Sequence, residues 1–230
     1  MVYTGSLVPE TLLNFCKKDV KVYDSSSLTL EQTHALLKEG FTAGECVVRL
    51  HTGDPSLYGA INEQIELLDR DGIACEVAPG VSAAFAAAAA MKQELTIPEI
   101  SQTVILTRLG GRTSVPEKEK LAALASHRAT LVIYLSVQRI EEVVVQLRAH
   151  YPADTPAIVA YRVSWPDQRL IRGTLENIAA KVQAENISRQ AVILVGEVFK
   201  TKGPAGEPIK RSKLYDETFG HQFRDAAAER

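Results

Sequence analysis

HTGDPSLYG (residues 51–59) follows the apolar run CVVRL and precedes the amphipathic segment AINEQIELLDRDG. This order predicts a strand, a loop and a helix, and in an open α/β sheet such loops lie at the carboxyl ends of the strands, where ligands bind. Gly53 allows the backbone to turn or to approach a ligand, Asp54 is suited to cap the following helix, and Pro55 is suited to its first position. Local folding alone explains these three residues, so a simple turn and a ligand-binding loop both stay open.

A second stretch of the same character is APGVSAAFAAAAAM (residues 78–91). It leaves the apolar run ACEVA, turns at Pro79 and Gly80, and enters a helix through Ser82, which is followed by alanines that present little side-chain bulk. Small residues permit the close approach of a ligand or of a neighbouring helix. The second loop therefore strengthens the ligand interpretation, although tight helix packing explains the same sequence.

Strands and helices alternate along the rest of the chain. Short runs rich in Val and Ile, most of them nearly continuous, are typical of strands covered on both faces, and they are CVVRL, ACEVA, TVILTR, TLVIYL, PAIVAYRV and AVILVGEVF. Thr29 and Gln32 have the spacing of a capping box, and the helix that they begin is expected to end at Gly40. Apolar spacing predicts further helices within 61–72, 115–127, 138–150 and 174–186. The chain is therefore predicted to be an α/β protein.

Two domains of similar size are expected. The helical pattern breaks at Pro98, between the alanine-rich helix and the strand TVILTR, so we predict an N-terminal α/β domain at 1–100 and a C-terminal α/β domain at 101–200. Residues 201–230 lack apolar periodicity and combine Gly and Pro with mixed charge. This composition predicts a mobile polar tail.

Composition favours a small-molecule partner. The 230 residues are 46% hydrophobic, and 26 basic against 28 acidic residues leave a net charge of −2, so there is no electrostatic reason to expect binding to nucleic acid or to a membrane surface. No run is long enough to span a membrane, and no cluster of ligands with suitable spacing predicts a metal site. Cys46 and Cys75 lie in apolar runs and are expected to be buried in a reducing compartment, which predicts a cytoplasmic protein.

Four segments identify a family resemblance: VVRLHTGDPSLYGAINEQ, VAPGVSAAFAAAAA, ELTIPEISQTVILTRLGGRT and AYRVSWPDQ. In this order and spacing they resemble the tetrapyrrole methylases, which use S-adenosyl-L-methionine. YTGSLVP near the start and SKLYDETFGHQFR in the tail are similar to the subfamily of cobalamin biosynthesis that methylates C11 of precorrin-4 or cobalt-precorrin-4. The resemblance covers essentially the whole chain.

The resemblance implies two α/β/α domains with a cofactor cleft between them, usually assembled as a homodimer. The family's motifs place S-adenosyl-L-methionine against Thr52, Gly53, Asp54, Ser82, Ala83, Leu135, Ala160, Tyr161 and Thr174. Leu135 and Ala160 are equally explained by ordinary strand packing. The residues expected to contact the tetrapyrrole are Tyr58, Arg108, Arg112 and Arg162, with Trp165 nearby or packing its loop.

Arg108 and Arg112 are suited to pair with carboxylates of the substrate, because a guanidinium makes planar bidentate contacts. An interdomain salt bridge or a solvated surface is an even alternative for both. The implied reaction is in-line transfer of a methyl group from a sulfonium to ring carbon C11, for which the protein mainly aligns the reactants and excludes water. His51 and Asp54 are the candidates for a base by position, although Asp54 is favoured to position the cofactor and His51 the loop.

The resemblance fails at the N-terminus. Members of the family begin with an apolar strand, a G-x-G-P-G-D-P loop and a helix, a unit of roughly 30 residues, and none of these is present in this sequence. The missing strand is expected near the centre of the first sheet. Either the sequence is truncated, with its start assigned to an internal codon, or the protein lacks the loop, and truncation is favoured because losing a central strand exposes strand edges.

Two other functions stay open. The chain is compatible with another tetrapyrrole methylase step, on uroporphyrinogen or another precorrin, and with a noncatalytic tetrapyrrole-binding remnant that has lost its first loop. A methylase of RNA is disfavoured because no basic patch with interleaved aromatic residues is present.

Overall fold

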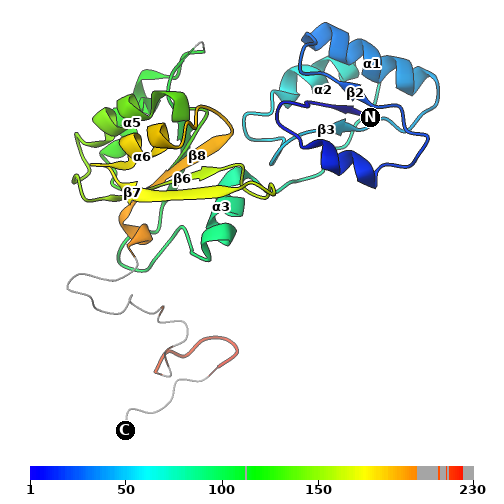
Figure 1. Cartoon of the computed structure of the whole chain (residues 1–230). Helices are drawn as coiled ribbons and strands as arrows, with labels where there is room; N and C mark the ends of the chain where they lie inside the picture. Colours follow the sequence, from blue (N-terminus) through cyan, green and yellow to red (C-terminus); the bar gives the residue numbers. More distant parts are fainter. Residues whose placement is uncertain (112, 201–211, 213–215, 217, 225–230) are drawn as a thin grey trace. The chain divides into compact units, whose positions relative to one another are not determined.

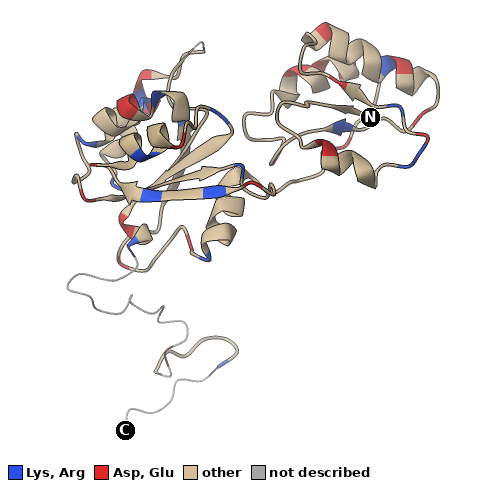
Figure 2. Cartoon of the chain, in the orientation of Figure 1, with Lys and Arg blue, Asp and Glu red and all other residues tan. Residues whose placement is uncertain are grey.

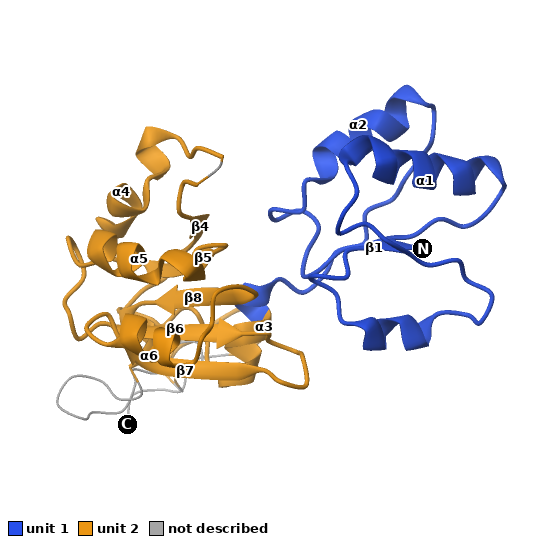
Figure 3. Cartoon of the chain, turned by 45° about the horizontal axis from the view of Figure 1, so that its top comes forward, with its two compact units in different colours: residues 1–85 blue, residues 86–230 orange. Residues whose placement is uncertain are grey.

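A computed structural model describes residues 1–111, 113–200, 212, 216 and 218–224. The chain divides into two compact units, Met1–Phe85 and Ala86–Arg230 (Figure 3). This division lies N-terminal to the domain boundary predicted at residue 100, and the helix α3 (Ala83–Met91) runs across it. Most of the predicted tail lies outside the described residues. Both units combine helices with a sheet, so the α/β prediction is confirmed.

Unit 1 is built on a short parallel sheet in the order β2-β1-β3. Its strands are β1 (Val2–Tyr3), β2 (Tyr23–Asp24) and β3 (Arg49–Leu50). The helices α1 (Leu30–Thr42) and α2 (Ile61–Arg70) lie on one face of this sheet, and the short 3-10 helix η1 (Glu10–Phe15) lies on the other (Figure 1). The carboxyl ends of the three strands therefore share one edge of the sheet. The loop at residues 51–59 begins at this edge, directly after β3.

The first helix confirms its predicted start. The Thr29 side chain accepts a hydrogen bond from the backbone N–H of Gln32, and the Gln32 side chain accepts one from the backbone N–H of Thr29. This capping box satisfies two N–H groups that the first turn of a helix leaves without partners. The helix continues two residues past Gly40 and ends at Thr42.

Residues 74–78 were predicted as a strand, and this prediction is wrong. Their backbone groups make no hydrogen bond within the described chain, and a strand needs a paired neighbour. Val48, before β3, and Val77, in this segment, are both 47% exposed. Cys46 and Cys75 are also exposed, so the expectation that they are buried is wrong for the same reason.

Unit 2 contains a five-stranded sheet in the order β4-β5-β8-β6-β7. The strands are β4 (Val104–Arg108), β5 (Thr130–Tyr134), β6 (Pro156–Tyr161), β7 (Arg169–Thr174) and β8 (Ala191–Val195). β4 and β5 are parallel, β8 is antiparallel to both β5 and β6, and β6 pairs with β7 in an antiparallel hairpin. The sequence did not reveal β7, because this edge strand carries exposed arginines instead of a continuous apolar run.

The helices α4 (Leu121–Ala125), α5 (Ile140–Leu147) and α6 (Ile178–Ala184) pack beside one another on one face of this sheet (Figure 1). The helix predicted within 115–127 is divided, since Lys120 is extended between the 3-10 helix η2 (Glu117–Glu119) and α4. Two further 3-10 helices are η3 (Val137–Arg139) and η4 (Glu197–Phe199). Apolar side chains of the sheet and of these helices form one core, including Leu131, Ile133, Val143, Leu147, Val159 and Ile193.

We expect Leu131→Ala to lower the free energy of unfolding by about 3 kcal/mol, since buried Leu→Ala substitutions cost about 2–5 kcal/mol. Leu131 is the second residue of β5 and is fully buried. Urea unfolding followed by circular dichroism measures the loss. The control is Val145→Ala on α5, where the side chain is 71% exposed, and a change within about 0.5 kcal/mol is expected. Equal losses in the two variants would contradict the core assignment.

Candidate functional site

The Asp54 carboxylate joins two loops of unit 1. Its Oδ1 accepts the backbone N–H of Ser56 at 2.8 Å, and its Oδ2 accepts the backbone N–H of Gly80 at 2.9 Å. The hydrogen bonds from Gly80 and then Ser56 hold the pKa of Asp54 below its usual value. An ionised Asp54 therefore ties the loop at 51–59 to the loop at 79–82, and it is a poor general base.

Asp54 and Pro55 do not begin the following helix, so that prediction is wrong. The helix α2 begins at Ile61. Tyr58 and Ala60 both have left-handed backbone conformations, with φ of 58° and 50°, and these conformations turn the chain before a helix can start. Tyr58, a candidate substrate contact, is 44% exposed at this turn.

Two glycines allow the loops to touch through their backbones. A Cβ atom at Gly80 would lie 2.0 Å from the carbonyl oxygen of Gly53, so no side chain fits there. Gly53 has a left-handed φ of 62°, and a Cβ built on it would lie 3.7 Å from Cα of Ser82 and 3.8 Å from the nitrogen of Ala83. The structure thus brings together the predicted cofactor contacts of unit 1, which are Thr52, Gly53, Asp54, Ser82 and Ala83.

His51 lies between β3 and this loop and is half-buried. Burial, and secondarily the charge of Arg49, lowers the pKa of His51. The imidazole is therefore neutral at pH 7, and one of its ring nitrogens can accept a proton. Thr52 and Gly53 beside it are exposed to solvent.

Arg49 is a residue of this edge that the sequence analysis missed. Its guanidinium donates to Oγ of Ser25 at 2.8 Å, to Oγ1 of Thr4 at 3.3 Å and to Oε1 of Gln64 at 3.2 Å. A signal was present in the sequence, because Arg49 is the charged residue of the apolar run CVVRL that leads directly into the loop.

Four of the predicted contacts in unit 2 share one edge of the sheet. Arg108 ends β4 and pairs with Tyr134 of β5, after which Leu135 follows, while Ala160 lies in β6 beside Tyr161 at its end. Because β8 is antiparallel to both β5 and β6, these two strands run in the same direction and end at the same edge. Arg108, Leu135 and the Ala160–Tyr161 pair therefore lie at strand ends along this edge, with the start of β8 between the ends of β5 and β6.

Strand packing, the alternative explanation for Leu135 and Ala160, accounts for only one of the two. Leu135 lies outside the strand, is 76% exposed and has a φ of 53°, so strand packing does not explain it. A left-handed leucine costs about 1–2 kcal/mol, and such strain is found at functional sites. Ala160 is fully buried and paired with Leu170 and Val192, so strand packing accounts for it.

Thr174 lies apart from the other predicted contacts of unit 2. It ends β7 and pairs with Pro156 at the start of β6, whereas Tyr161, at the end of β6, pairs with Arg169. At about 3.3 Å per residue, Thr174 is roughly a strand length from Tyr161. Its backbone N–H donates to Oδ1 of Asn177 at 3.0 Å, which gives it a local role before α6.

The Arg108 guanidinium organises the loop that follows β4. Its Nη1 donates to the carbonyl oxygens of Leu109 at 3.1 Å and Thr113 at 3.2 Å, and its Nη2 donates to that of Ser114 at 3.1 Å. Two of its five N–H groups stay available to a ligand. Arg112, predicted in the same loop, lies outside the described residues.

Arg162 is held by its own unit. Its Nη1 lies 2.7 Å from Oδ2 of Asp167, its Nε donates to Oε1 of Gln190 at 2.6 Å, and its guanidinium stacks on Trp165 at 4.6 Å from the ring centroid. Trp165 therefore packs with Arg162 in the hairpin between β6 and β7. Contact of Arg162 with the substrate stays a prediction.

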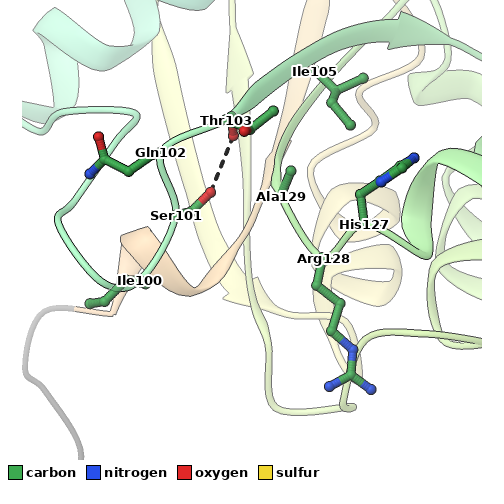
Figure 4. Close-up of a pocket in the computed structure, with 8 residues that line it drawn as sticks. All are labelled: Ile100, Ser101, Gln102, Thr103, Ile105, His127, Arg128 and Ala129. Carbon is green, nitrogen blue, oxygen red and sulfur yellow. Dashed lines mark hydrogen bonds between the residues drawn. The ribbon is translucent and has the colours of Figure 1, made fainter.

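Two hollows of unit 2 lie away from most of these residues. One of 440 Å³ is lined by Ser101, Thr103, His127 and Arg128 among others, and Figure 4 shows Ser101 donating to the Thr103 carbonyl beside it. These residues precede β4 and β5, so this hollow lies at the amino ends of the strands. The second, of 280 Å³, is lined by Leu109, Gly110 and Glu142 among others, next to the loop that Arg108 organises.

Charge is mixed throughout the described chain. Figure 2 shows Lys and Arg interspersed with Asp and Glu in each unit. Within the described ranges, no group of three or more His, Cys, Asp and Glu side chains is arranged to hold a metal ion. No helix in the part that the structure describes is long and apolar enough to cross a membrane.

Residues 1–179 match the family of Tetrapyrrole (Corrin/Porphyrin) Methylases. The chain belongs to this family. The cobalt-precorrin-4 C(11)-methyltransferase of Methanocaldococcus jannaschii is 49% identical over 97% of this chain and 85% of that protein. The precorrin-4 C(11)-methyltransferase of Pseudomonas aeruginosa is 49% identical over 93% of this chain and 85% of its own length.

Solved structures of tetrapyrrole methylases share the fold. The X-ray structure of the cobalt precorrin-4 methyltransferase CbiF matches with a TM-score of 0.82 and 42% identity, over 85% of this chain and 82% of that one. A uroporphyrin III C-methyltransferase from Thermus thermophilus matches with a TM-score of 0.71 and 26% identity, over 90% of this chain and 85% of that one. The resemblance identified from the sequence is therefore confirmed.

We expect Gly80→Ala to uncouple the two loops of unit 1, because the added Cβ cannot remain 2.0 Å from the Gly53 carbonyl oxygen. Hydrogen exchange measured by mass spectrometry should become faster in peptides covering 51–59 and 78–82. The control is Gly44→Ala, which carries the strain of a left-handed φ of 72° but has no neighbour within 4 Å of the added Cβ. Unchanged exchange in Gly80→Ala would show that the loops are not held by this contact.

We expect Asp54→Asn to destabilise the protein in a pH-dependent manner. The folded pKa of Asp54 lies below its unfolded value, so its contribution is complete above about pH 5 and is lost as the pH falls below about 4. The difference in melting temperature between wild type and Asp54→Asn should therefore shrink on acidification. The control is Asp69→Asn, at an exposed position of α2, which should leave the melting temperature at pH 7 close to that of wild type. A difference that is constant from pH 7 to pH 3 would contradict the role of the Asp54 carboxylate.

Proposed function

We propose that this protein transfers the methyl group of S-adenosyl-L-methionine to C11 of precorrin-4 or cobalt-precorrin-4. The observation that carries the proposal is the 49% identity to two C(11)-methyltransferases over nearly the whole chain. The two relatives differ in the cobalt named in their substrate, so both forms of the substrate stay within the proposal. The lower identity to the uroporphyrin III enzyme, 26%, favours this step over other tetrapyrrole methylations.

The residues present suit the methyl donor. In unit 1, exposed Thr52 and Gly53 offer backbone groups to an amino-acid moiety, and the ionised Asp54 places a negative charge beside a cationic donor. In unit 2, Leu135 presents an exposed apolar side chain at a strand end, which suits the flat face of an adenine ring. Bound S-adenosyl-L-methionine supplies a methyl group already activated by its sulfonium.

The protein's part in the reaction is alignment and exclusion of water. Asp54 fixes the two loops of unit 1 in one arrangement through its bonds to Ser56 and Gly80, so the donor-binding backbone is set before the substrate arrives. If the product's proton is taken by a side chain, neutral His51 is better suited than Asp54, whose lowered pKa and occupied oxygens make it a weak base. Water is an equally suitable acceptor.

Homodimerisation and a cytoplasmic location belong to the same proposal and are supported by the family resemblance and the composition. Size-exclusion chromatography with light scattering tests the first. A noncatalytic tetrapyrrole-binding protein is the alternative, and the titration below distinguishes the two.

Calorimetric titration with S-adenosylhomocysteine, followed by a methylation assay with precorrin-4 and its cobalt form, tests the function. We expect a Kd on the order of micromolar, with one methyl group gained by the product at C11. Gly80→Ala should raise the Kd at least about tenfold because it separates the loops, and Gly44→Ala should leave it unchanged. The noncatalytic alternative would be supported by a folded chain that binds tetrapyrrole, does not bind S-adenosylhomocysteine and forms no methylated product.

A further inference from the structure

Arg49 is a half-buried cation whose protein partners are all neutral. It lies in β3, and its three nitrogens donate to the hydroxyl groups of Thr4 and Ser25 and to the side-chain carbonyl of Gln64. Thr4 follows β1 and Ser25 follows β2. The guanidinium is therefore fixed across the carboxyl ends of all three strands of unit 1.

The acids of this edge do not neutralise Arg49. Oδ1 of Asp24 accepts the backbone N–H groups of Gly5 at 2.8 Å and Ser26 at 2.9 Å, while its Oδ2 accepts the Ser26 hydroxyl at 2.9 Å. Asp54 is similarly occupied by backbone N–H groups. Burial alone lowers the pKa of Arg49, with no carboxylate opposing it, and Arg49 takes part in no ion pair within the described residues.

A buried charge without a counter-ion costs free energy, and an anion that binds beside it recovers part of that cost. Arg49 uses one N–H on each of its three nitrogens, so one N–H remains on each terminal nitrogen. Two such donors match the two oxygens of a carboxylate. The neighbouring His51 is neutral at pH 7. It therefore adds no positive charge to the site, and its ring N–H can donate a hydrogen bond to an anion.

We propose that Arg49 binds a carboxylate side chain of the tetrapyrrole at the carboxyl end of β3. This assignment rests on the proposed function, since the acetate and propionate groups of precorrin-4 are the carboxylates in question. It makes Arg49 a residue of substrate affinity and orientation, with no part in donor binding.

The test compares Arg49→Gln, Arg49→Lys and the control Arg70→Gln in the methylation assay. Arg49→Gln should raise KM for precorrin-4 about tenfold to a hundredfold, as expected for loss of a charged hydrogen bond, with kcat changed less than about threefold and the Kd for S-adenosylhomocysteine unchanged. Arg49→Lys keeps the charge without the planar fork and should lie between wild type and Arg49→Gln. Arg70, paired with Glu66 on exposed α2, should behave as wild type. Circular dichroism and melting temperatures establish that each variant is folded.

A binding arm identifies the group that Arg49 contacts. Uroporphyrin and its methyl ester serve as stable probes, and their binding is followed by fluorescence. The acid should lose affinity in Arg49→Gln, whereas the ester should bind wild type and variant alike. Equal losses for acid and ester, an unchanged KM, or a Kd for S-adenosylhomocysteine that rises as much as KM would each overturn the assignment. If wild type itself binds the acid but transfers no methyl group, the proposed function fails while the carboxylate contact is still decided by this arm.

Discussion

The Asp54 carboxylate accepts backbone N–H groups from two loops 26 residues apart in the sequence, and the arrangement of the unit 1 site depends on this bridge. The segment 74–78, which leads into the second loop, forms no ladder with β3 within the described residues. Charge-assisted hydrogen bonds are about twice as strong as neutral ones. The contact between Gly53 and Gly80 then follows, since a carboxylate with so short a reach brings the two backbones together.

Stability and strain are divided between different parts of each strand. In unit 2 the strands β5 and β6 supply fully buried side chains such as Leu131 and Val159, whereas the residues just beyond the strands, Leu135 and Arg162, have left-handed conformations. Each such conformation costs about 1–2 kcal/mol, which a large core can offset. Unit 1 has short strands and a smaller core, so its left-handed residues at Tyr58 and Ala60 depend more on local bonds such as those of Asp54.

Local signals predicted local structure. The capping box of Thr29 and Gln32 was sufficient to predict the start of α1 because its two partners lie three residues apart. The apolar runs of unit 2 were sufficient to predict strands because any apolar neighbour can cover them. The run ACEVA failed because a strand is defined by its neighbour, which apolarity cannot supply. Motif matching placed Gly53 and Asp54 in a loop, but only the structure revealed that Gly80 is the partner of Asp54. The carbonyl contacts of Arg108 were equally hidden, since backbone acceptors leave no trace in the residue types.

At this edge of unit 1, the two aspartates and Arg49 differ in the kind of partner they have. Asp24 and Asp54 each accept two backbone N–H groups, which hold the pKa of each carboxyl below its usual value, so their negative charge is fixed in position and they are weak bases. Arg49 has only neutral partners, so its positive charge stays available. The proposed cationic methyl donor and polycarboxylate acceptor are both suited by this separation, because a site in which Arg49 paired with Asp54 would attract neither. Discrimination between the two reactants can therefore begin with electrostatics, before any contact with the reacting carbon is made.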